Sequence, residues 1–389
     1  MENLVLKGDN INSLHYLIDN NKKFRFIYID PPYNTNLTDL GYTDKLTKSQ
    51  WSKFMYDRLV LAKEVMTDDG LIFISIDEKS FVELMPVCEK IFKYHVQTFI
   101  WKCRGAANDH KNNASFNHEY ILCYAKTAKD IRLVGQKKDF EKYKNPDNDP
   151  NGPWIKDSGT AASGTDDYVY PIINPYTKEE FYPPKGRFWA FPSYRVDEYE
   201  KSGKIVFGKT KDEPGLIIKR YKNQIRHDEF TVSSTVLVED KKITTSQGTK
   251  ELRKIFPEGV KFKYPKPVEL IKYLISLYPD NNKDLEVLDF FAGTGTTGQA
   301  VDELNKEDKG TRHFVLCTNN ENNICDNITK ERLKRKGIDF KEVVFDDETN
   351  KKYIQKDVLK ENLEKVLEKK IDNDKKIEEI IKIIKNSNY

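Results

Sequence analysis

The stretch FIYIDPPYNT at positions 26–35 places an acid, two prolines and a tyrosine directly after a short apolar run. The carboxylate of Asp30 can accept one N–H of an exocyclic amine on a nucleic-acid base. The carbonyl of Pro31, held still between two proline rings, can accept the other N–H. Such an amine attacks poorly because its lone pair is delocalised into the ring, and two acceptors would steer it towards tetrahedral geometry. The motif therefore favours chemistry on an amine nitrogen.

A tyrosine completes this motif with a flat aromatic face. An extruded base can stack on such a face, and the contact contributes about 1–3 kcal/mol in nucleic-acid complexes. The same four residues could instead form only a rigid turn after a strand. A second motif later in the chain argues against that simpler interpretation. The candidate catalytic residues are Asp30, Pro31, Pro32 and Tyr33.

The second motif, LDFFAGTGTTGQA, places Gly293, Gly295 and Gly298 between an expected strand and an expected helix, and Glu321 follows the next strand. This pattern predicts a nucleoside-containing cofactor at the helix N-terminus with an acid near its ribose. Dinucleotide sites, S-adenosylmethionine sites and purely structural glycine turns all share it. A nicotinamide enzyme needs a proton donor that the sequence does not single out. S-adenosylmethionine carries an activated methyl group and needs mainly a well-placed nucleophile, so the two motifs together favour methyl transfer.

Short apolar runs alternate with helix-like segments at both ends of the chain. Continuous apolar strands are buried on both faces, which is typical of a parallel sheet covered by helices. We therefore predict an α/β fold with a doubly wound sheet built from both ends of the sequence. The expected strands lie within residues 3–9, 24–30, 70–77, 119–126, 285–293 and 313–320.

The middle of the chain, from about residue 130 to 255, is rich in turn formers, aromatic residues and lysines, and predicts an inserted module of irregular or mixed structure. A basic stretch within it, interleaved with Phe207 and Tyr221, could follow a phosphate backbone or form a solvated face. After about residue 346, apolar residues at helical spacing predict a pair of surface helices. The basic stretch comprises Lys201, Lys204, Lys209, Lys211, Lys219, Arg220, Lys222 and Arg226.

Composition narrows the class of protein. The 389 residues are 38% hydrophobic, which suffices for one large or two modest globular units. Apolar stretches are too short for a membrane span and the N-terminus lacks a signal-peptide layout, so we expect a cytoplasmic protein without membrane contact. Five scattered cysteines without a CxxC pair argue against disulfides and zinc, so we expect buried thiols and no metal. The net charge of +3 neither requires nor excludes nucleic acid.

Taken together, these motifs resemble the amino-directed DNA methyltransferases, specifically the permuted β group of adenine-N6 enzymes. The resemblance covers most of residues 1–345 and includes KGDNINSLHYL, FNHEYILCYAK, GRFWAFPSYR and YPKPVELI in family order. It points to the modification subunits of type III restriction–modification systems and their solitary relatives. It implies a circularly permuted, Rossmann-like sheet with four regions. These are a catalytic half at 1–130, a target-recognition region at 131–255, a cofactor-binding half at 256–345 and a helical tail at 346–389.

The resemblance also implies roles for individual residues. Asp9 would contact the adenine of S-adenosyl-L-methionine and Glu321 the ribose hydroxyls, although Asp9 could simply cap a helix and Glu321 could be a turn residue. The PKP segment would line the outer side of the cofactor pocket, although Lys266 could be a surface charge. We interpret Asp77, in ISIDE, as structural. The remaining implied cofactor-binding residues are Asp30, Lys266, Pro267, Asp289, Phe291, Ala292, Gly293, Thr294, Gly295, Thr296 and Thr297.

The implied activity is methyl transfer to adenine N6 within a short sequence of double-stranded DNA, with one base flipped out. Cytosine-N4 methylation uses the same amine chemistry, but SPPY is the commoner form there, so Asp30 favours adenine. A non-catalytic DNA-binding relative is the other alternative. A homodimer and a restriction endonuclease subunit are the implied protein partners. Because type III modification subunits are generally much longer, the chain is either a compact relative or a fragment.

Overall fold

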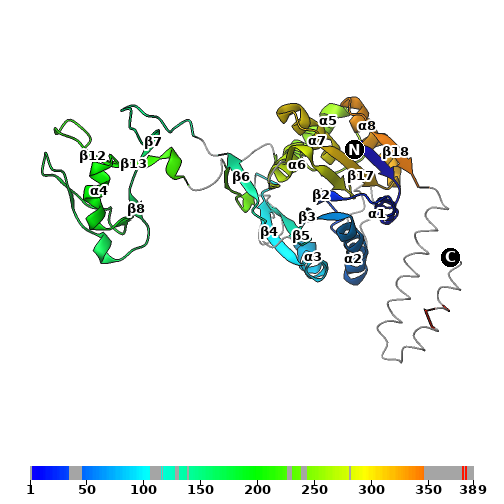
Figure 1. The fold of residues 1–389 in the computed structure, drawn as a ribbon. Helices are drawn as coiled ribbons and strands as arrows, with labels where there is room; N and C mark the ends of the chain where they lie inside the picture. Colours follow the sequence, from blue (N-terminus) through cyan, green and yellow to red (C-terminus); the bar gives the residue numbers. More distant parts are fainter. Residues whose placement is uncertain are drawn as a thin grey trace. The chain divides into compact units, whose positions relative to one another are not determined.

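The computed structural model describes residues 2–34, 46–105, 115, 117–127, 131–137, 140–225, 230–237, 243–279, 282–345, 379–380 and 382. Two compact units are present, one formed by residues 1–135 and 232–389 and the other by residues 136–231 (Figure 1). The second unit falls inside the segment 131–255, where the sequence predicted a separate module. Most of the predicted helical tail lies outside the described residues. No described helix has the length and apolar character needed to cross a membrane.

The first unit contains a nine-stranded sheet in the order β15-β4-β5-β3-β2-β16-β17-β1-β18. Among its described strands, β5 runs antiparallel to β3 and β4, and the other neighbours are parallel. The strands are β1 (Leu4–Lys7), β2 (Phe24–Ile29), β3 (Met66–Ile76), β4 (Tyr94–Trp101), β5 (Glu119–Ala125), β15 (Val236–Leu237), β16 (Glu286–Asp289), β17 (His313–Thr318) and β18 (Lys341–Val344).

The strand order brings the two sequence motifs together. β2, which leads into DPPY, pairs in parallel with β16, which leads into the glycine motif, and Leu288 lies opposite Ile27. From β16 the sheet continues to β17 on one side, and from β2 it continues to β3 on the other. Ligands of doubly wound sheets bind at such a reversal, outside the carboxyl ends of the strands. The predicted doubly wound fold is confirmed, with the first strand of the chain placed beyond β17.

Helices cover both faces of this sheet (Figure 1). Side chains of a strand alternate between faces, and β2 shows the result. Phe26 and Tyr28 pack in the cluster that contains residues of α6, α7 and α8, whereas Ile27 and Ile29 pack in the cluster with α1, α2 and α3. The helices are α1 (Asn10–Asp19), α2 (Lys48–Val65), α3 (Glu78–Ile91), α5 (Thr245–Ile255), α6 (Val268–Ser276), α7 (Thr296–Asp308) and α8 (Lys330–Arg335).

Side-chain caps determine where three of the helices begin. The Asp9 carboxylate accepts from the Ile11 amide at 2.8 Å, and the Asp77 carboxylate accepts from the Ser80 amide at 2.9 Å. Thr47 forms a capping box with Gln50 at the start of α2. Such caps typically stabilise a helix by about 1 kcal/mol. Asp77 is therefore structural, as predicted, and Asp9 does cap a helix.

The second unit is built from short antiparallel pairs around its own apolar cluster, which includes Trp189, Phe191 and Ile218. Its three-stranded sheet has the order β12-β13-β7, and β8 pairs with β11 and β9 with β10. β6 (Val134–Lys137) and β14 (Phe230–Val232) pair where the chain enters and leaves this unit. The other elements are β7 (Trp154–Asp157), β8 (Thr160–Ala161), β9 (Ile172–Ile173), β10 (Glu180–Phe181), β11 (Phe188–Trp189), α4 (Val196–Lys201), β12 (Ile205–Phe207) and β13 (Leu216–Tyr221).

Candidate active site

A cavity of about 310 Å³ lies in the first unit, bordered by residues that follow β1, β2, β16 and β17. Its position at the carboxyl ends of these strands is the one expected for a doubly wound sheet. Three residues of α2, which the sequence did not single out, also line it: Trp51, Phe54 and Arg58. The predicted site residues that line it are Asp9, Asp30, Pro32, Phe291, Gly293 and Glu321.

The other predicted cofactor residues are buried around this cavity and do not border it. Three belong to the loop after β16, one ends β16, two begin α7, and two precede α6. Their contacts with a cofactor stay a prediction. They are Lys266, Pro267, Asp289, Ala292, Thr294, Gly295, Thr296 and Thr297.

The DPPY motif presents two hydrogen-bond acceptors in fixed positions. Asp30 Oδ1 accepts from the Tyr33 hydroxyl and from Lys266 Nζ, both at 2.8 Å. Within the described part of the chain no donor reaches Asp30 Oδ2 or the carbonyl oxygen of Pro31. The next carbonyl, that of Pro32, accepts from Trp51 Nε1 at 2.8 Å. Within the described residues, one carboxylate oxygen and one rigid carbonyl therefore have no donor, and their contact with a substrate amine stays a prediction.

Lys266 joins the DPPY motif to a carboxylate that the sequence did not reveal. Its ammonium lies 2.8 Å from the Tyr33 hydroxyl and 3.4 Å from Glu119 Oε2. The Tyr33 hydroxyl lies 3.0 Å from that same Glu119 oxygen and shares its single proton between Glu119 and Asp30. At 8% exposure, Lys266 is not a surface charge, so that alternative is wrong. The structure places the ammonium beside the carboxylate of Asp30.

Electrostatics hold Lys266 and Tyr33 each in one protonation state. Burial alone would lower the pKa of the Lys266 ammonium, but the neighbouring carboxylates of Asp30 and Glu119 outweigh it and raise the pKa. Burial and the same two carboxylates raise the pKa of Tyr33 well above its ordinary value. At neutral pH the lysine is therefore charged, and the tyrosine keeps its proton as a donor.

Glu119 reaches the site because of strand direction. It is the first residue of β5, which runs antiparallel to β3. The start of β5 therefore lies at the same edge of the sheet as the end of β3 and the end of β2, which runs parallel to β3. In sequence, Glu119 is only an acid before an apolar run, and nothing marks it as close to Tyr33. The pairing of β5 with β3 is what brings them together.

A second wall of the cavity is held by Arg58, whose side chain is 7% exposed. Its Nη2 donates to both Asp9 oxygens, at 3.1 and 3.2 Å, and its Nε donates to Asn10 Oδ1 at 2.6 Å. The guanidinium lies over the Phe54 ring, 3.6 Å from the centroid. Asn10 in turn donates to the carbonyl of Phe290 at 2.9 Å. Asp9 is therefore both a helix cap and a fixed part of the cavity wall.

The loop after β16 needs its glycines for backbone reasons. Gly293 has a φ of +49° and Gly295 a φ of +76°, a conformation that other residues rarely adopt. A Cβ at Gly295 would also lie 3.2 Å from the Thr329 side chain. The Thr329 hydroxyl donates to the Gly293 carbonyl at 2.6 Å. This tight loop leads directly into α7, whose first amides have no side-chain cap.

Asp289 fixes this loop through two hydrogen bonds. Its Oδ1 accepts from the Phe291 amide at 3.0 Å, and its Oδ2 accepts from the Thr297 hydroxyl at 2.5 Å. Asp289 is 3% exposed, and burial raises the pKa of its carboxyl to about 7. Asp289 thus ties the start of the loop to the first turn of α7.

This pKa predicts a pH dependence of stability. The folded protein holds a proton on Asp289 that the unfolded chain releases near its ordinary pKa of 3.8. Between pH about 4 and 7 the folded state therefore binds more protons, and its stability falls as the pH rises. Asp289→Asn should remove this contribution. Relative to the variant, the wild type should lose roughly 2 kcal/mol of its free energy of unfolding between pH 5 and pH 7.5. Urea unfolding of both proteins at both pH values measures it, and a pH-independent difference would contradict it.

Glu321 lines the same cavity as Asp30 and begins a short turn of helix after β17. Asn322 and Asn323 follow with φ values of 51° and 59°. Glu321 is therefore a turn residue that also lines the cavity, so the two interpretations of it do not exclude each other. Its contact with a ribose stays a prediction.

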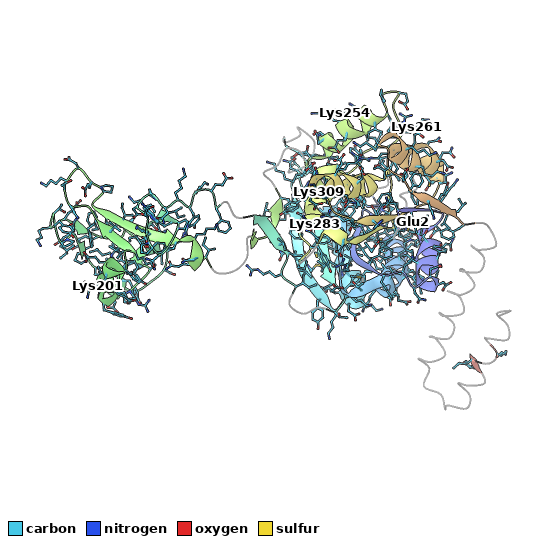
Figure 2. The ribbon with its side chains drawn as sticks, turned by 45° about the horizontal axis from the view of Figure 1, so that its top comes forward. Glu2, Lys201, Lys254, Lys261, Lys283 and Lys309 are labelled. Atoms are coloured by element: carbon cyan, nitrogen blue, oxygen red, sulfur yellow. The ribbon has the colours of Figure 1, made fainter. Side chains whose placement is uncertain are left out.

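The basic stretch of the second unit divides into exposed and buried side chains. Lys219 corrects the prediction, because it is 3% exposed and pairs with Asp147 at 2.6 Å and Asp149 at 2.5 Å. It is a structural residue of this unit and not a free charge. Arg220 pairs with Asp157 at 3.2 Å, and Arg226 lies outside the described residues. The side chains of Lys201 (Figure 2), Lys209, Lys211 and Lys222 are exposed, and Lys204 is half-buried against Tyr199.

All five cysteines are free and buried, as predicted. Burial raises the pKa of the Cys103 thiol to about 11 and that of Cys325 to about 12, and it raises the pKa of the other three as well. Thiols in this state are protonated at neutral pH and are poor nucleophiles. Cys317 lines the cavity and shares this property.

Known proteins resemble this chain in sequence. The modification subunit of the type III restriction–modification enzyme StyLTI from Salmonella typhimurium is 34% identical over 383 residues, which cover 86% of this chain and 56% of that subunit. The type II methyltransferase M.KpnI from Klebsiella pneumoniae is 31% identical, over 80% of this chain and 79% of M.KpnI. The chain thus spans little more than half of the StyLTI subunit.

Among solved structures, the complex of M1.HpyAVI with SAM is similar with a TM-score of 0.40 and 12% identity, over 85% of this chain and 98% of M1.HpyAVI. The family model described as DNA methylase matches residues 24–334, a segment that contains both motifs and the second unit. The resemblance found in the sequence is confirmed, and the chain belongs to this family of DNA methylases.

Proposed function

We propose that this chain transfers a methyl group from S-adenosylmethionine to the N6 amine of an adenine in DNA. The observation that carries the proposal is the pair of available acceptors, Asp30 Oδ2 and the Pro31 carbonyl, beside a cavity that also contains the glycine loop. The names of the relatives, a type III modification subunit and a type II methyltransferase, support it.

The residues of the cavity fit the proposed cofactor. Asp9 and Glu321 offer carboxylates to the amine and hydroxyl donors of an adenosine. Gly293 and Gly295 lack Cβ atoms, so a ligand can approach the backbone closely at these two positions. S-adenosylmethionine supplies a methyl group activated by a positively charged sulfur.

The catalytic work of the chain is to orient the amine. Asp30 Oδ2 and the Pro31 carbonyl each accept one N–H, which turns the nitrogen lone pair out of the ring plane and towards the cavity. Lys266 and Tyr33 hold Asp30 through its other oxygen, so the geometry is present before the substrate binds. When the new N–C bond forms, the C–S bond of the donor would break and its electron pair would stay on the sulfur. The nitrogen would then carry an extra proton, which the Asp30 carboxylate is positioned to accept before it passes to water. The aromatic face of Tyr33 supports a flipped base.

The second unit is proposed as the target-recognition region. Exposed lysines such as Lys201 and Lys209 would follow the phosphate backbone of double-stranded DNA. A restriction subunit as partner rests on the relatives named as modification subunits of restriction–modification enzymes. A homodimer and a cytoplasmic location rest on the resemblance and composition of the sequence.

A product analysis tests the proposed function. The purified protein is incubated with S-adenosylmethionine and DNA from a methylation-deficient host, and the DNA is digested to nucleosides for mass spectrometry. We expect N6-methyladenine, because Asp30 in DPPY favours adenine over cytosine. We expect no 5-methylcytosine, because the buried, protonated thiols cannot activate a ring carbon. N4-methylcytosine would instead identify the alternative amine substrate. 5-Methylcytosine, or no methylation of any DNA tested, would contradict the proposal.

A further inference from the structure

One buried cation of the first unit forms no ion pair with a carboxylate among the described residues. The Arg332 side chain, on α8, is fully buried. Its Nη1 donates to Thr296 Oγ1 at 2.8 Å and to Thr294 Oγ1 at 3.0 Å, and its Nε donates to Gln299 Oε1 at 2.8 Å. Within the described part of the chain, Nη2 has no hydrogen-bond partner. No ion pair joins Arg332 to a described carboxylate.

Other buried arginines of this unit differ from Arg332. Arg58 pairs with Asp9, and Arg312 pairs with Asp308 at 2.7 Å. A buried charge without a partner is costly, and proteins usually neutralise it. Burial lowers the pKa of Arg332 to about 10, so it is still protonated at neutral pH. The carboxylates of Glu251 and Glu303 act on this charge in the opposite direction to burial, but neither forms an ion pair with it, so the protein maintains a positive charge behind the glycine loop.

Arg332 is connected to the cavity through the glycine loop. Thr294 and Thr296, which accept from Arg332, follow Gly293, and Gly293 lines the cavity. α7 starts at Thr296, and its uncapped first amides add the positive end of a 13-residue helix. Two sources of positive potential therefore act at one end of the cavity.

The acidic side chains of the cavity wall are distinct from the glycine loop, where the positive potential acts. Asp9, Asp30 and Glu321 are acidic, and the lining cation Arg58 is already neutralised by Asp9. An adenosine presents hydrogen-bond donors, which suit the acidic part of the wall. The amino-acid end of S-adenosylmethionine carries a carboxylate, which suits the positive potential at the glycine loop.

From this arrangement we propose that Arg332 is a positioning residue that holds Thr294 and Thr296 and supplies the potential selecting the carboxylate of S-adenosylmethionine. The inference rests on the proposed function. A purely structural role makes a different prediction, because a brace that only shapes the loop would affect every ligand of the cavity equally.

Binding of two ligands separates these roles. S-adenosylhomocysteine carries both the amine and the carboxylate, whereas S-adenosyl-3-thiopropylamine keeps the amine and lacks the carboxylate. We expect Arg332→Met to lower the affinity for S-adenosylhomocysteine by roughly 10- to 100-fold, as measured by titration calorimetry. The affinity for S-adenosyl-3-thiopropylamine should fall by less than about threefold. The control is Arg335→Met, on the same helix, where the arginine is partly exposed and pairs with Glu331 at 2.8 Å. It should change neither affinity.

The outcomes are distinct. Equal losses for both ligands in Arg332→Met would overturn the inference and leave the proposed function intact. If that variant does not fold, the wild type still decides, because it should prefer S-adenosylhomocysteine by at least about tenfold and Arg332→Lys should keep that preference. A wild type that binds both ligands equally would overturn the inference. A wild type that binds neither would overturn the proposed function.

Discussion

Replacing Asp30 with alanine should lower the rate of methyl transfer by about 10³-fold or more. The variant loses one of the two acceptors that turn the amine lone pair towards the methyl group, and it loses the nearest base for the departing proton. Cofactor affinity should change by less than about threefold, because the glycine loop and Glu321 are untouched. Lys266 keeps Glu119 at 3.4 Å, so its charge remains compensated and the fold should survive. Single-turnover kinetics and calorimetry with S-adenosylhomocysteine measure the two effects.

Asp77→Ala is the matched control for this variant. Asp77 also follows a strand and also precedes a helix, but its carboxylate caps α3 and does not line the cavity. The control should lose about 1 kcal/mol of stability and keep its turnover. If Asp30→Ala turned over at near the wild-type rate, or lost cofactor affinity as strongly as turnover, the role assigned to Asp30 would be wrong.

Replacing Lys266 with methionine should lower turnover by about 10²-fold and also destabilise the fold, by up to about 3 kcal/mol. The ammonium holds Asp30 Oδ1 and the Tyr33 hydroxyl at 2.8 Å each. Without it, the carboxylates of Asp30 and Glu119 repel each other across the tyrosine. Adding Glu119→Gln to this variant should restore part of the stability, because it removes the excess negative charge. Urea unfolding and steady-state kinetics measure both quantities.

Lys272→Met is the matched control, because it shows what the loss of any buried, ion-paired lysine does to stability and turnover. Lys272 is also 8% exposed and pairs with two carboxylates, Glu269 at 2.8 Å and Glu307 at 2.5 Å, but neither of them belongs to the cluster around Asp30. This control should be destabilised and should retain turnover per folded molecule. Equal losses of turnover in Lys266→Met and Lys272→Met would show that Lys266 acts only through stability.

Sequence by itself determined the two motifs and the kind of sheet that unites them. Both DPPY and the glycine motif follow continuous apolar runs, and such runs require burial on both faces by helices. In the structure, Phe26 packs in the apolar cluster on one face of the sheet and Ile27 in the cluster on the other, so both faces are buried. Local rules also sufficed for Asp77, because a cap depends only on residues a few positions away.

Tertiary structure alone decided which charges meet. Lys266 and Asp30 are separated by 236 residues, and Tyr33 and Glu119 by 86, so no local pattern connects them. Lys219 belongs to a basic run in sequence, yet its partner Asp149 lies 70 residues away and makes it a buried structural residue. The reason is physical: apolar periodicity reports which side chains leave water, but an ion pair depends on distance in space. Strand order and direction set that distance, and they become known only when the sheet is assembled.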